Sequence, residues 1–97
     1  MATLHYSARA LEDLARLGDF LIEDDPEAGR ATAALIVDGL EVLETHPLIG
    51  RIATGTLREL VISRGRSGYL ALYEYQPATD RVVVVAIRHQ REAGFEE

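Results

Sequence analysis

The apolar residues follow a helical period in the first half of the chain and a strand period in the second. Residues 8–24 carry leucines spaced three or four apart, which is the period of an amphipathic helix. Ser7, just before them, suits an N-cap. The same period covers residues 26–45 and begins with Pro26, which is favoured in a first helical turn. The short connection between these segments predicts an antiparallel helix hairpin.

Four further segments have the pattern of strands. Residues 3–7 alternate between apolar and polar positions, which is typical of a short, half-buried strand. Residues 57–63 and 69–76 alternate as well, and they are separated by turn sequences. Residues 81–88 are apolar on both faces, so we expect this strand to lie inside the sheet. The segment "HPLIGRIATGT", residues 46–56, is expected to be a loop.

The predicted order of elements is one strand, two helices and three strands, which indicates a two-layer α+β fold. The helix hairpin would cover one face of a four-stranded antiparallel sheet. We expect the strand order 1-4-3-2, with the first strand antiparallel to the last. Residues 1–97 leave room for a single domain.

Charge and composition narrow the possible functions. The chain has a net charge of −6 and no cysteine, so a disulfide framework and a thiolate metal site are excluded. Residues 1–50 hold three arginines against ten acidic residues, whereas residues 51–91 hold seven against three. The acidic total argues against direct, non-specific DNA binding by this chain alone. We expect no cofactor, no metal, no membrane span and no signal peptide, consistent with a cytoplasmic protein.

The cations at the end of the last strand are the first candidates for a site. They are either the solvated end of a strand, a surface that binds a partner, or a catalytic cluster in which His89 transfers protons. A second group of arginines lies in the strand 57–63 and in the turn after it, where Arg58 could instead pair with an acid of the helix hairpin. The candidate partner-binding residues are Arg58, Arg64, Arg66, Arg88, His89 and Arg91.

Two other groups have simpler interpretations. Tyr69, Tyr73 and Tyr75 share one face of a predicted strand and could stack bases, but such a stripe is more often the lining of a sheet. Glu12 and Asp13 are neighbours in a helix and point in different directions, so we expect both to be solvated.

The order of elements and five short motifs resemble the RelE/ParE superfamily of bacterial toxins. The motifs are "YSARALEDL", "HPLIGR", "RELVI", "GYLALYEY" and "AIRHQREAG", and together they span almost the whole chain. The resemblance implies a small toxin that a cognate antitoxin binds and silences. RelE-like members cut messenger RNA on the ribosome, whereas ParE-like members inhibit DNA gyrase.

Leu70 favours the ParE-like branch. RelE-like toxins commonly have an arginine just after the aromatic residue that opens this strand, and leucine cannot stabilise a phosphate there. The acidic charge also disfavours ribosome binding. The alternatives are an endoribonuclease that uses His89 and Arg88, and a degenerate member that binds its antitoxin without poisoning the cell.

The resemblance also implies the partners. The antitoxin would be ParD-like, with a ribbon-helix-helix fold and a disordered tail that orders on binding. Apolar residues of the first helix could form its groove. The candidates are Leu17, Phe20 and Leu21.

Overall fold

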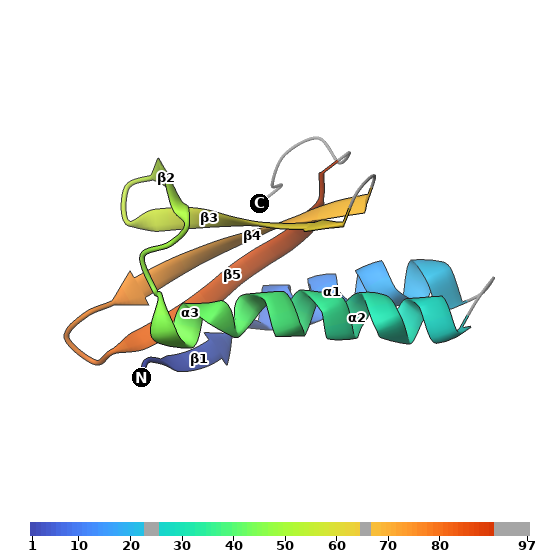
Figure 1. Ribbon diagram of the computed structural model, residues 1–97, viewed down its shortest axis with the longest axis horizontal. Helices are drawn as coiled ribbons and strands as arrows, with labels where there is room; N and C mark the ends of the chain where they lie inside the picture. Colours follow the sequence, from blue (N-terminus) through green and yellow to red (C-terminus); the bar gives the residue numbers. More distant parts are fainter. Residues whose placement is uncertain (23–25, 65–66, 91–97) are drawn as a thin grey trace.

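The protein consists of a helical layer packed on one face of a twisted sheet (Figure 1). The computed structural model describes residues 1–22, 26–64 and 67–90. The elements in chain order are β1 (Thr3–Tyr6), α1 (Ala8–Ile22), α2 (Pro26–Leu40), α3 (Val42–Thr45), β2 (Arg51–Thr54), β3 (Leu57–Arg64), β4 (Ser67–Gln76) and β5 (Arg81–His89).

The described strands form one sheet in the order β1-β5-β4-β3-β2. Strand β5 therefore lies between β1 and β4, which confirms the interior position predicted from its apolar sequence. Strands β2 to β5 are joined by antiparallel pairing. Strand β1 is parallel to β5, with Thr3 opposite Arg81 and Tyr6 opposite Val84. The sheet is thus mixed rather than antiparallel.

The predicted antiparallel pairing of the first strand was wrong because the chain does not reverse after β1. Ser7 lies beside Val84 and Asp13 beside Ile87, so α1 runs along β5 in the direction of β1. Only α2 returns (Figure 1). The predicted count of strands was also wrong, because Arg51–Thr54 forms the edge strand β2 where a loop was expected. This strand is four residues long and fully exposed, so it lacks the alternating pattern that reveals a strand.

The predicted helix hairpin is confirmed in its main features. The second helix is interrupted at Glu41, so that α2 is followed by the single turn α3. Gly39 brings α2 close to the sheet, since a Cβ atom at this position would lie 2.9 Å from Cγ2 of Ile62. The hydrophobic core lies between the two layers, and its most completely buried large side chains are Ile36, Leu40, Leu43, Tyr73, Val82, Val84 and Ile87.

The loop between α3 and β2 is anchored to the sheet around Gly50. The backbone N–H of Gly50 donates to the hydroxyl of Tyr73 at 2.9 Å, and Arg58 donates to the carbonyl oxygens of Gly50 and Leu48 at 2.8 and 3.2 Å. A Cβ atom at position 50 would lie 2.9 Å from the carbonyl oxygen of Glu59, so only glycine fits without a backbone shift.

We predict that Tyr73→Phe lowers the free energy of unfolding by about 1–2 kcal/mol, because the buried N–H of Gly50 loses its acceptor. The matched control is Tyr75→Phe, which removes a hydroxyl that donates to Asp80 in an exposed position. Its effect should be much smaller. Urea unfolding of both variants measures the difference, and equal losses would show that the Gly50 anchor contributes nothing special.

We also predict that stability falls as the pH rises above about 10, where exposed tyrosines ionise. Burial raises the pKa of Tyr73, although the Gly50 hydrogen bond and Arg58 partly offset this effect. Burial, with the charges of Glu41 and Glu44, raises the pKa of Tyr6. The unfolded chain therefore ionises first, and stability present below this pH is lost above it. The chain has no lysine or cysteine whose titration would obscure the effect. In Tyr73→Phe the free energy of unfolding, measured as a function of pH, should therefore fall less steeply above about pH 10.

Candidate functional site

Several predicted site residues meet at one end of the sheet. His89 lies opposite Tyr69 in β4, and the N–H of Gln90 donates to the carbonyl oxygen of Gly68 at 2.9 Å. The next pair of the β3–β4 hairpin is Arg64 with Ser67. The backbone of Arg64 therefore lies near the end of β5. We call Arg16, Arg88 and His89, together with the backbone position of Arg64, the basic end of the sheet.

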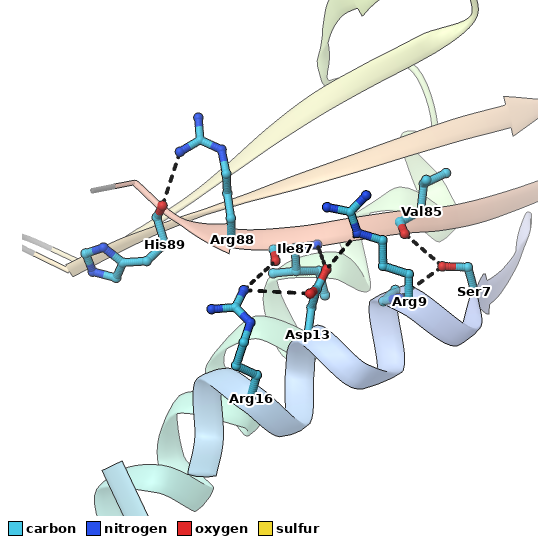
Figure 2. Close-up of polar contacts among 9 residues, drawn as sticks. Ser7, Arg9, Asp13, Arg16, Val85, Ile87, Arg88 and His89 are labelled. Carbon is cyan, nitrogen blue, oxygen red and sulfur yellow. Dashed lines mark hydrogen bonds and ion pairs between the residues drawn. The ribbon is translucent and has the colours of Figure 1, made fainter. Parts of the chain in front are cut away.

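Arg88 and His89 point to opposite faces of the sheet (Figure 2). Arg88 pairs with Leu70 and points away from the helices, and its Nη1 donates to the carbonyl oxygen of His89 at 3.2 Å. His89 lies on the other face, where its ring meets the edge of Tyr69 with centroids 5.3 Å apart. The two side chains therefore do not converge on a common reacting atom.

A β-bulge at Val85 determines these two directions. Leu72 of β4 pairs with Ala86, whereas the following residue, Tyr73, pairs with Val84, so that Val85 is an extra residue in β5. Strict alternation from the buried Val82 and Val84 would turn Arg88 toward the helices. The extra residue shifts the alternation, so that Ile87 enters the core instead.

Helix α1 binds the backbone of β5 on both sides of this bulge. The hydroxyl of Ser7 donates to the carbonyl oxygen of Val85 at 2.8 Å and accepts from the N–H of Ala10 at 3.0 Å. The second bond is the N-cap predicted from the sequence. One hydroxyl thus begins α1 and satisfies the carbonyl that the bulge exposes (Figure 2).

Asp13 makes the next contact along the same edge of β5. Its Oδ2 accepts from the N–H of Ile87 at 2.9 Å, and the carboxylate lies 3.9 Å from Arg9 and 3.7 Å from Arg16. Arg16 in turn donates to the carbonyl oxygen of Ile87 at 3.5 Å. The expectation that Asp13 is solvated was wrong, since its side chain is only 14% exposed. The neighbouring Glu12 is exposed, as expected.

Several other predicted site residues contribute to the fold itself. Arg58 holds the Gly50 loop rather than an acid of the helix hairpin. Leu17 is buried in the core, so it lines no open groove. Tyr69 and Tyr73 are buried, and neither ring offers an open face for base stacking.

Four predictions lie outside the described residues: the positions of Arg66 and Arg91, and the side chains of Phe20 and Leu21. The side chain of Arg64 is likewise outside them.

An exposed apolar surface lies on the loop anchored by Gly50. Leu48, Ile49 and Ile52 are 57%, 56% and 70% exposed. Leu48 and Ile49 border a shallow depression of about 570 Å³, whose lining is completed by Thr45, His46, Pro47 and Tyr75. The sequence pattern did not reveal this surface, because three apolar residues near a proline are equally typical of a buried turn.

The described residues contain neither a cluster of metal ligands nor a membrane-spanning helix. No three His, Asp or Glu side chains there gather as ligands for a metal ion. No helix in the same part of the chain is long and apolar enough to cross a membrane.

Solved structures from two toxin–antitoxin systems share this fold. The chain resembles the chromosomal ParDE toxin–antitoxin system of P. aeruginosa, with a TM-score of 0.77 and 19% identity over 92% of this chain and 96% of that one. It also resembles the intact E. coli RelBE toxin–antitoxin complex, with a TM-score of 0.64 and 17% identity over 95% and 100% of the two chains.

Sequence comparison identifies the family. A model of the ParE toxin of the type II toxin–antitoxin system parDE matches residues 4–94. Toxin RelE3 of Caulobacter vibrioides is 35% identical over 92 residues, which cover 95% of this chain and 98% of that protein. The chain therefore belongs to the ParE toxin family of type II toxin–antitoxin systems.

We predict that Ser7→Ala lowers the free energy of unfolding by about 1–3 kcal/mol, because it removes a helix cap and leaves the carbonyl of Val85 unsatisfied. Thr3→Ala is a suitable control, since the Thr3 hydroxyl makes an exposed contact with Asp80 at 3.4 Å. Thermal unfolding followed by circular dichroism compares the two variants. A loss in Thr3→Ala as large as that in Ser7→Ala would contradict the prediction.

Proposed function

We propose that this toxin inhibits DNA gyrase by binding it and breaks no bond in a nucleic acid. The observation that carries the proposal is the arrangement of the basic end of the sheet. Arg88 and His89, the residues that a nuclease would need there, lie on opposite faces of the sheet. Cleavage of RNA requires a proton-transfer group and a phosphate-stabilising cation that act on one phosphate. The observed arrangement supports a binding surface instead.

Leu70 supports the same conclusion. It occupies the position where RelE-like toxins commonly have an arginine, and it is only 6% exposed. It lies opposite Arg88 across the strand pair. The net charge of −6 gives no general attraction to ribosomal RNA. Positive charge is concentrated at a few positions of the sheet, which suits contact with one acidic protein surface.

The second partner in this proposal is a cognate antitoxin of the ParD type, with a ribbon-helix-helix domain and a tail that orders on binding. Two solved structures that resemble this chain come from toxin–antitoxin systems, which supports an antitoxin here by similarity. Candidate contacts are the basic residues at positions 64, 66, 88, 89 and 91, with the apolar side chains of Phe20 and Leu21. Toxin, antitoxin and gyrase would meet in the cytoplasm.

A ribosome-dependent endoribonuclease is the second candidate, and the name of a close relative favours it. The relative with 35% identity is called toxin RelE3. Under this alternative His89 would be a proton-transfer group and Arg88 a phosphate-stabilising cation. A toxin that binds its antitoxin but poisons no target is the third candidate.

Induced expression separates these candidates. A gyrase inhibitor should trigger the SOS response within one generation, and the purified protein should block supercoiling by gyrase. An endoribonuclease should instead stop translation and leave cut messenger RNA on ribosomes, an outcome that would refute our proposal. Normal growth together with antitoxin binding would identify the inactive alternative and would refute it as well.

We predict that Arg88→Ala reduces growth inhibition by about tenfold or more, the size expected when a charged contact is lost from an interface. Arg81→Ala provides a matched control, because it removes an exposed arginine from the opposite end of the same strand. His89→Gln should change the potency by less than about threefold, since glutamine retains hydrogen bonding and loses the titratable proton and the ring contact with Tyr69, neither of which a binding surface requires. Complete loss of toxicity in His89→Gln would restore the nuclease alternative.

A further inference from the structure

We propose that Asp13 is the positioning residue for the basic end of the sheet, which it holds in place through the backbone of Ile87. This inference rests on the proposed function, because it assumes that Arg88 and His89 act on a target. It adds to the site Asp13 of α1, which was expected from the sequence to be solvated.

The edge of β5 requires such a residue. Pairing between β1 and β5 ends with Tyr6 opposite Val84, so the following residues of β5 have no strand beside them on this edge within the described part of the chain. A backbone N–H group that is buried beside a helix and has no acceptor lowers the stability of the protein. Asp13 supplies that acceptor to Ile87 at 2.9 Å, as a neighbouring strand otherwise would (Figure 2).

The surroundings of Asp13 hold its carboxylate in place. Arg9 and Arg16 lie one turn before and after it on α1, at 3.9 and 3.7 Å. Arg16 also donates to the carbonyl oxygen of Ile87 at 3.5 Å, so both polar groups of this backbone unit are bound by α1. A carboxylate that accepts a backbone hydrogen bond between two cations is constrained far more than a solvated one.

Ile87 determines the directions of Arg88 and His89. It is 1% exposed, and it directly follows Ala86, the residue at which β5 resumes regular pairing after the bulge. Because strand side chains alternate, a one-residue slip at Ile87 would exchange the faces of Arg88 and His89. The hydrogen bond to Asp13 opposes that slip on the edge that β1 does not cover.

The first test measures the strand itself. In Asp13→Ala the exchange rate of the Ile87 amide, followed by NMR, should rise about tenfold or more relative to the Val84 amide, since only the former loses its acceptor. Asp13→Asn keeps an acceptor oxygen and should remain within about threefold of the parent protein. Glu12→Ala removes the same charge from the neighbouring exposed position and should change nothing. Unchanged Ile87 exchange in Asp13→Ala would overturn the proposal.

The second test measures coupling to function as growth inhibition, which does not presuppose gyrase as the target. Asp13→Ala should reduce potency by about fivefold or more, and the double variant with Arg88→Ala should be no weaker than Arg88→Ala alone. Asp13→Asn should restore most of the potency. If Asp13 only stabilised the fold, the two losses would multiply, and that result would refute the positioning role.

The two proposals fail in distinguishable ways. Full potency of Arg88→Ala would refute the functional role of the basic end, while Ile87 exchange would still decide whether Asp13 fixes the strand. Translation arrest without gyrase inhibition would refute the proposed target only. If Arg88→Ala loses potency and the losses of Asp13→Ala and Arg88→Ala multiply in the double variant, only the positioning role would be refuted.

Discussion

The extra residue at Val85 is the constraint on which the rest of the molecule depends. A bulge in an interior strand leaves backbone groups without ladder partners, and a fold tolerates it only where other groups bind them. Ser7 does so with a single hydroxyl, which also caps α1. Ser7 therefore fixes three features at one point: the end of β1, the start of α1, and the face of the sheet to which each later side chain of β5 points. The positions of the helical layer and of the basic end follow from it.

The sequence predicted what depends on local pattern. The amphipathic leucines identified α1, the uninterrupted apolar run identified β5 as interior, and Ser7 was recognised as a cap. The parallel pairing of β1 was missed because it depends on the contact between Ser7 and Val85, 78 positions apart, which no local period encodes. Strand β2 was missed because an exposed edge strand of four residues carries no alternation.

The role of Asp13 was missed for a similar reason. Asp13 has the sequence context of a solvated helical acid, and its neighbour Glu12 is one. Only the fold shows that its acceptor oxygen meets the N–H of Ile87, 74 positions away. Arg58 was correctly considered for a structural role, but its partners are carbonyl oxygens of a loop. Backbone partners of side chains depend on three-dimensional register, and residue types alone do not determine it.

The same register explains why an acidic chain can place cations at the end of its most apolar strand. The last residues of β5 leave the core while Asp13 and Arg16 of α1 still bind the backbone of Ile87. In β5 the bulge sends Arg88 to the face away from the helices and turns His89 against Tyr69, so adjacent residues serve different surroundings. The two helix arginines beside Asp13 neutralise this acid, which approaches the end of β5 from α1. The basic end of the sheet therefore remains positively charged although the protein as a whole is negative. Because α1 holds the end of β5, this charge can be presented in one fixed direction.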